Sequence, residues 1–169
     1  MRLCWTTIAL VAGATLAFGP ISAQQHESPL PPPNAEAPPY YKSLSLEGEF
    51  KTDPFPIGVV AGGRYSVSRM GRDCIGNITA ERPDVTVEFK DGKRPLTLYA
   101  AAASDTSLLV HTPGGQWLCA DDTTDGGMNP ALTFDRPENG TYAVWVASVD
   151  TSSRPVPAVL AISEFAPSW

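Results

Sequence analysis

The sequence is short of histidine, cysteine and basic residues, and no long apolar run follows its amino-terminal segment. It contains 2 His, 3 Cys and 12 Lys and Arg residues against 18 Asp and Glu, which gives a formal net charge of −6. A chain this acidic is a poor candidate for binding nucleic acid or an anionic membrane, because both need clustered Lys and Arg. No later run approaches the roughly 20 residues of a membrane helix, so we predict no membrane span.

Catalytic patterns are also missing. The two histidines are His26, in a proline-rich segment, and His111, on a predicted strand beside apolar residues. A Ser-His-Asp site would need an activated serine near His111, and the sequence has no nucleophile-elbow motif. We therefore predict that the chain is not an enzyme.

The first residues have the parts of a secretory signal peptide. Arg2 precedes an apolar run over 8–18, and the small residues Ser22 and Ala23 follow it, so we expect cleavage after Ala23. Residues 24–42 are rich in proline and poor in aliphatic side chains. This composition favours a disordered tether, although proline-rich segments also serve as ligands of aromatic grooves. The chain thus divides into a signal peptide at 1–23, the tether at 24–42 and one domain at 43–169, and we predict a periplasmic or secreted location.

Two cysteines, Cys74 and Cys119, remain in the exported chain. Export makes a disulfide between them the default. The alternatives are two free thiols or half of a metal site, and two cysteines without nearby histidines make a poor zinc site. We predict a Cys74–Cys119 disulfide, which would stabilise the fold by roughly 4 kcal/mol through the long loop that it closes.

Short extended runs fill the rest of the chain. Val85, Val87 and Phe89 alternate with polar residues, and the Pro-Gly-Gly run at 113–115 separates two apolar runs as in a hairpin. Glycine and proline stand at nearly every junction, and no amphipathic helical stretch follows the signal peptide. The pattern predicts an all-β fold, an antiparallel sandwich or barrel, with strands at 43–50, 57–61, 65–68, 75–79, 85–89, 96–101, 108–112, 116–119, 142–146 and 159–165.

Several of these segments resemble the bacterial pre-peptidase C-terminal domain. The resemblance rests on the runs DTSLLV at 105–110, PGG at 113–115, CADD at 119–122, NP at 129–130 and GTY at 140–142. The Cys-Ile-Gly run at 74–76 is similar to an element of a secreted, disulfide-bearing branch of that family. The resemblance implies a jelly-roll-like β-sandwich. Domains of this family commonly accompany secreted proteases and other hydrolases as non-catalytic modules, and some bind calcium, collagen or polysaccharide.

An acidic loop that contains glycine follows the hairpin. Calcium takes roughly six to eight oxygen ligands from carboxylates, amides and backbone carbonyls. An EF-hand is excluded, because Leu132 occupies the place of its bidentate glutamate and no helices flank the loop. The resemblance adds Asp105 as a neighbour of the loop. The alternative is that Asp, Asn and Gly simply form turns here. We predict a candidate Ca²⁺ site built from Asp105, Asp121, Asp122, Asp125 and Asn129.

Three aromatic residues are candidates for binding a sugar ligand. Trp117, Tyr142 and Trp145 would suit stacking on sugar rings if they were exposed, but we expect at least two of them in the core. The leading hypothesis is a non-catalytic binding module that recognises a protein or polysaccharide surface with the help of calcium. A structural or chaperone-like accessory of a secreted hydrolase is the second hypothesis, and an enzyme is the third.

Overall fold

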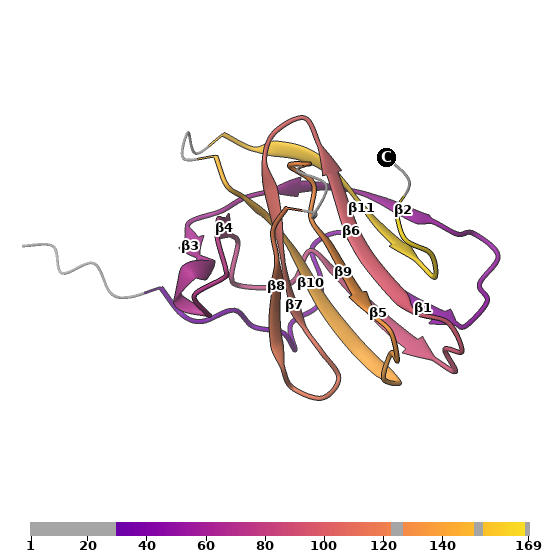
Figure 1. Ribbon diagram of the computed structural model, residues 1–169. Helices are drawn as coiled ribbons and strands as arrows, with labels where there is room; N and C mark the ends of the chain where they lie inside the picture. The colour runs from indigo at the N-terminus through magenta and orange to yellow at the C-terminus, as the bar shows by residue number, and fades with distance from the viewer. Residues whose placement is uncertain (1–29, 123–126, 151–153, 168–169) are drawn as a thin grey trace, which may run out of the picture.

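Two β-sheets packed face to face form the fold (Figure 1). The computed structural model describes residues 30–122, 127–150 and 154–167. Within these ranges there is no α-helix, and a single 3₁₀ turn, η1 (Val67–Arg69), interrupts the strands. The all-β sandwich predicted from the sequence is thus confirmed. The predicted signal peptide lies outside the described residues, and no helix within them is long and apolar enough to span a membrane.

Within the described residues, ten of the eleven strands fall close to the predicted runs, because alternating apolar residues and the glycine and proline residues between them mark most of their ends. Strand β9 has no counterpart among those runs. Their bounds are β1 Lys42–Glu47, β2 Phe55–Ala61, β3 Tyr65–Ser66, β4 Asn77–Ile78, β5 Val85–Lys90, β6 Leu96–Ala102, β7 Thr106–His111, β8 Trp117–Ala120, β9 Ala131–Phe134, β10 Gly140–Ser148 and β11 Val156–Ser163.

Strand β10 is the centre of the larger sheet. It pairs with β5 along one edge and with β7 along the other, β8 follows β7, and β1 lies beyond β5. The short strands β4 and β3 continue from the end of β10 at Ser148. The smaller sheet has the order β2-β11-β6-β9. One pair differs from the antiparallel expectation: β1 runs parallel to β5, with Lys42 opposite Val85. The chain passes through the other sheet between these two strands, so no tight turn fixes their direction.

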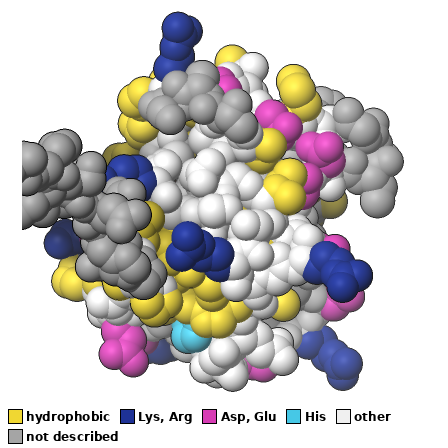
Figure 2. All heavy atoms as spheres, turned by 90° about the vertical axis from the view of Figure 1, so that its left-hand side faces the viewer, with side chains coloured by type: hydrophobic (Ala, Val, Ile, Leu, Met, Phe, Trp, Pro, Cys, Tyr) yellow, Lys and Arg dark blue, Asp and Glu magenta, His cyan; other side chains and the backbone are white. Residues whose placement is uncertain are grey.

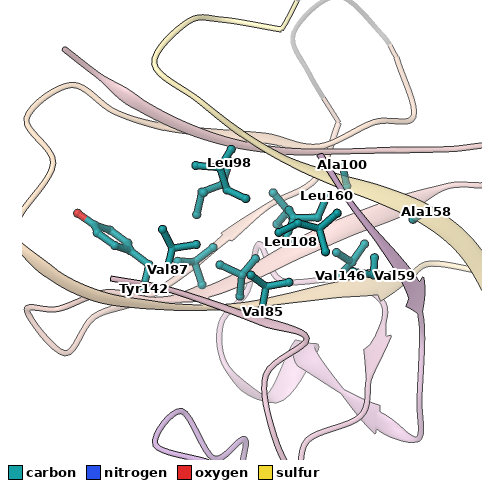
Figure 3. Close-up of a cluster of buried hydrophobic side chains, with 14 of the residues drawn as sticks. Val59, Val85, Val87, Leu98, Ala100, Leu108, Tyr142, Val146, Ala158 and Leu160 are labelled. Carbon is teal, nitrogen blue, oxygen red and sulfur yellow. The ribbon is translucent and has the colours of Figure 1, made fainter. Parts of the chain in front are cut away.

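The main core fills the space between the two sheets. Figure 3 shows side chains from both sheets meeting there, among them Val85, Leu108 and Val146 from the larger sheet and Leu98 and Leu160 from the smaller one. All five are fully buried or nearly so. Burial of this much aliphatic surface is the main stabilising contribution to such a fold.

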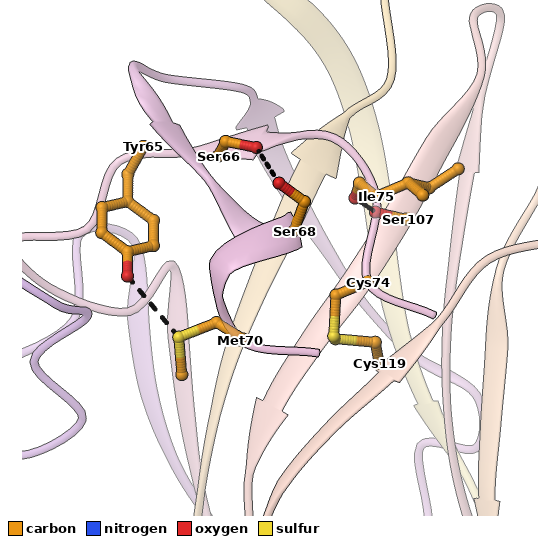
Figure 4. Close-up of a disulfide and its surroundings, with 8 residues drawn as sticks. All are labelled: Tyr65, Ser66, Ser68, Met70, Cys74, Ile75, Ser107 and Cys119. Carbon is orange, nitrogen blue, oxygen red and sulfur yellow. Dashed lines mark hydrogen bonds between the residues drawn. A yellow bond between two sulfur atoms is a disulfide. The ribbon is translucent and has the colours of Figure 1, made fainter. Parts of the chain in front are cut away.

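A second cluster covers the outer face of the larger sheet. Trp145 points to this face, and its indole N–H donates to the carbonyls of Thr79 (3.1 Å) and Arg82 (2.8 Å). Residues 65–80 cover this face, and the Cys74–Cys119 disulfide ties them to β8 (Figure 4), as the sequence predicts. Strand β10 is therefore buried on both faces, which explains its nearly continuous apolar sequence.

The aromatic residues divide as expected. Tyr142 and Trp145 are almost completely buried, one in each cluster, and Trp117 is partly exposed. Tyr142 also donates its hydroxyl to the Glu138 carbonyl at 3.1 Å. These two rings are therefore core residues and present no face to a sugar.

Part of the predicted tether lies along the domain. The backbone N–H of Asn34 donates to the Ala80 carbonyl at 2.9 Å, that of Tyr40 to the Pro83 carbonyl at 2.8 Å, and Pro33 is buried. Leu30 and Ala35 also pack against the outer cluster, so this part of the predicted tether contacts the domain. The domain boundary at residue 42 stays a prediction.

Candidate metal centre

Three of the predicted calcium ligands meet at one end of the sandwich. Asp105 lies in the turn from β6 to β7, and Asp121 and Asp122 follow β8. Each offers a carboxylate oxygen, and the three oxygens lie within 4.8 Å of one another. Both connections cross between the sheets, since β6 and β9 belong to the smaller sheet and β7 and β8 to the larger one. Two crossovers at the same end therefore bring together acids that are distant in the sequence.

Backbone hydrogen bonds hold both connections in place. Asp122 forms an isolated antiparallel bridge with Pro130, so the acidic loop is closed at its base. The N–H of Val149 donates to the Asp105 carbonyl at 3.2 Å, and that of Thr106 donates to the Met128 carbonyl at 3.4 Å. The carboxylates are thus carried by backbone that the sheets fix in position.

The carboxylates are arranged with their charges close together and partly out of water. Within the described residues, Asp105 Oδ1 and Asp121 Oδ1 are buried without a hydrogen-bond partner. Burial raises the pKa of Asp105, and the charge of Asp122 raises it further. The pKa of Asp121 is also raised, first by burial and then by the charges of Asp122 and Asp105. A cation would relieve both the repulsion and the unsatisfied oxygens, because hard divalent ions take carboxylate ligands.

The other two predicted ligands are Asn129 and Asp125. The side-chain oxygen of Asn129 accepts a hydrogen bond from the N–H of Ala102 at 3.1 Å, which ties the end of the loop to β6. Asp125 lies outside the described residues. A ligand role for Asn129 and Asp125 stays a prediction.

His111 belongs to a row of tilted aromatic rings. Its ring lies 4.6 Å from that of Trp117, centroid to centroid, and Trp117 lies 5.6 Å from Trp145. The ring of His111 therefore packs against Trp117 at the partly exposed end of β7.

The carboxyl of Asp84 is buried in the structure, which the sequence does not predict. Asp84 precedes β5 and is only 6% exposed, and its Oδ2 accepts a hydrogen bond from the N–H of Val146 at 2.7 Å. Burial raises the pKa of Asp84 to about 7, although the bond from Val146 lowers it. The local sequence Arg-Pro-Asp at 82–84 is typical of a turn, so no local signal indicates that this carboxyl is inside.

The comparisons with known proteins concern the fold. No protein-family model matches the chain, and no curated protein matches it. The structure is similar to the pre-peptidase C-terminal domain of a collagenase from Bacillus anthracis, with 9% identity, a TM-score of 0.44, and coverage of 75% of this chain and 98% of that one. It is also similar to PliG of Aeromonas hydrophila, a periplasmic lysozyme inhibitor of g-type lysozyme, with 16% identity, a TM-score of 0.40, and coverage of 72% and 96%. The collagenase domain is of the class that the sequence resembles.

Proposed function

We propose that the chain is an exported, non-catalytic binding module that recognises a protein or glycan surface, and that Ca²⁺ bound by Asp105, Asp121 and Asp122 assists this recognition. The observation that carries this proposal is the convergence of three carboxylates, with buried oxygens on two of them that have no partner among the described residues. The disulfide supports export, because such bonds persist in oxidising compartments.

Calcium fits the donor set better than the alternatives. The three donors are oxygens, with no histidine or thiolate among them, so zinc and copper are disfavoured. Magnesium demands nearly ideal octahedral geometry at about 2.0–2.1 Å, whereas calcium accepts irregular sets of six to eight oxygens. Further ligands would come from backbone carbonyls of the loop and from water, as is usual for calcium sites in loops.

The metal is tested by thermal unfolding with calcium and with chelator. A ligand that binds only the folded state at 100 times its Kd stabilises it by about 2.7 kcal/mol, which would raise Tm by roughly 10 °C for a domain of this size. We expect Ca²⁺ to raise Tm well above its value in chelator and Mg²⁺ to do less. The double substitution Asp121→Asn and Asp122→Asn should erase the difference.

Asp135→Asn is the matched control. Asp135 is an exposed acid after β9 and is not part of the carboxylate cluster, so its substitution removes one negative charge away from the cluster and should preserve the response to calcium. Equal Tm values in calcium and in chelator would remove the metal from the proposal. Recognition of a partner is tested by using the mature protein to capture proteins or glycans from the envelope fraction of the source cells. If the same partner is captured equally well in chelator, its binding does not require calcium.

A further inference from the structure

A pocket of about 490 Å³ opens where several short segments from different parts of the chain meet. Its walls come from the residues before β1, β5 and β11, and from the end of β2, strand β4 and the end of β10. Strand β2 belongs to the smaller sheet and β10 to the larger one, so the pocket lies at a mouth between the two sheets. Its volume is within the range of about 300–1,000 Å³ that is typical of small-ligand sites.

The floor of this pocket carries buried polar groups. Asp84 and Ser148 both line it and are 6% and 3% exposed. Asp84 accepts the N–H of Val146, but the hydroxyl of Ser148 has no hydrogen-bond partner in the described part of the chain. Buried polar atoms are nearly always paired, and leaving one unpaired costs about 1–3 kcal/mol. The Ser148 oxygen itself has almost no accessible surface, so a ligand reaches this unpaired hydroxyl only when the Ser148 side chain turns toward the pocket.

The wall at the end of β2 is fixed in shape. Gly62 has a φ of +112°. Its N–H donates to the Val146 carbonyl (3.3 Å), and its carbonyl accepts a hydrogen bond from the Thr79 hydroxyl (3.1 Å). A Cβ at Gly63 would lie 2.1 Å from the backbone of Ile78, so a larger residue cannot occupy this position without displacing β4. A preformed wall lowers the cost of ordering that a ligand must overcome.

Two tyrosines stand at the same pocket with their rings half exposed. Tyr40 and Tyr41 are 49% and 44% exposed and line the pocket. The Tyr41 hydroxyl accepts the N–H of Val60 at 3.1 Å, and the guanidinium of Arg82 lies 5.0 Å from the centre of the Tyr40 ring. The rings are thus held in place and still open to a ligand. Fixed tyrosines supply a rigid apolar surface at low entropic cost, which suits the C–H face of a pyranose ring.

The charges around the pocket have no single sign. Arg64 and Arg154 line it together with Asp84 and Asp150, and the pKa of Asp84 is raised to about 7 by burial. On the face that carries β3 and β4, basic, acidic and hydrophobic side chains are interspersed (Figure 2). An anionic or cationic ligand would meet a like charge here, whereas a neutral polyhydroxyl ligand would meet donors and acceptors of both kinds.

We propose that this pocket binds a neutral pyranose unit of a glycan, with Tyr40 and Tyr41 against the C–H face of the ring and Ser148, Asp84 and Asn77 at its hydroxyls. The inference rests on the binding role proposed above and names its ligand class. It does not depend on calcium, because none of the three clustered carboxylates lines the pocket.

The test is a titration of the exported protein, in chelator, with maltotriose, cellotriose and chitotriose, followed by the NMR signals of the backbone amides. We expect at least one trisaccharide to shift the Val146 and Gly62 amides saturably. Ser148→Ala should weaken its binding roughly 3- to 10-fold, the value of one neutral hydrogen bond. Tyr40→Ala should weaken it about 10-fold, because the stacking surface is lost.

Thr106→Val is the matched control for Ser148→Ala. The Thr106 hydroxyl is also buried without a partner within the described residues, and Thr106 pairs with Ser148 across the strands, but it does not line the pocket. We expect Thr106→Val to bind like the unmodified protein. Ser148→Ala should keep or raise Tm, because its hydroxyl has no partner in the folded chain, so a loss of binding would not reflect unfolding.

Three outcomes would overturn the inference. The first is no saturable shift with any of the three sugars, and the second is equal affinity in Ser148→Ala and the unmodified protein. The third is binding of trigalacturonic acid alone, abolished by Arg64→Gln, which would make the ligand an anion. A rise of Tm in calcium without sugar binding would contradict the proposed sugar site and leave the proposed metal site standing. Sugar binding without a rise of Tm in calcium would contradict the metal site and leave the sugar site standing.

Discussion

Replacing the buried carboxyl of Asp84 should change how the stability of the domain depends on pH. The side chain is 6% exposed, and burial raises its pKa from the ordinary value of 3.8 to about 7. Because the pKa is higher in the folded state, the unfolded chain releases this proton first. Ionisation of Asp84 therefore costs nothing below about pH 4, destabilises the fold progressively between about pH 4 and 7, and adds no further cost above that range.

The magnitude follows from the same pKa. The interval from 3.8 to about 7 is worth on the order of 4 kcal/mol at 1.36 kcal/mol per pKa unit. Asp84→Asn stays neutral at every pH and keeps an oxygen that accepts the N–H of Val146, as Oδ2 does now. We expect the substituted protein to match the unmodified one at pH 4 and to be more stable by up to about 4 kcal/mol at pH 8.

Urea unfolding of both proteins at pH 4, 6 and 8 measures this difference. The pKa values of Asp105 and Asp121 are also raised, but their contributions are common to the two proteins and cancel in the comparison. A difference in unfolding free energy that stays constant from pH 4 to pH 8 would refute the reasoning. So would a substituted protein that is the less stable one at pH 8.

Three further predictions concern the fold and its export. Replacing both Cys74 and Cys119 by Ala should lower the unfolding free energy by about 4 kcal/mol, since the bridge spans 45 residues; an unchanged urea midpoint would contradict this. Val144→Asp should unfold the domain, because the side chain is fully buried, whereas Thr141→Asp at an exposed position of the same strand should leave its circular dichroism spectrum unchanged. Mass spectrometry of the exported protein should find Gln24 at its amino terminus, and intact Met1 would refute the predicted cleavage.

Local signals predict most of this fold. The alternation around Val85 and Phe89 and the glycine turn before β8 each depend on residues close in the sequence, and these strands lie where the pattern places them. The outer cluster around Trp145 could not be predicted in the same way. Its cover comes from 65–80, a segment with only two short strands and one 3₁₀ turn, and irregular backbone leaves no periodicity that shows which face it buries.

The two candidate sites differ in the same way: the sequence indicates the acidic cluster but not the pocket. Asp121 and Asp122 are neighbours in an acidic run, so the sequence itself indicates them, and Asp105 enters only through the family resemblance. The pocket at Asp84 and Ser148 has no sequence signature, because several short segments from different parts of the chain supply its walls. A buried carboxyl and a buried hydroxyl become a site only when tertiary structure removes them from water.

The two candidate sites share one end of strand β10, and this affects how each is tested. Ser148 forms the pocket floor, and the N–H of the next residue, Val149, donates to the Asp105 carbonyl. A backbone shift at Asp105 would therefore reach the pocket directly. Asp121 and Asp122 follow β8 instead, and substitution by Asn removes their charge with little change in shape. Substituting these two while Asp105 stays intact separates the loss of a cation from a displacement of β10, and a sugar affinity that fell with them only in calcium would show that the cation couples the two sites.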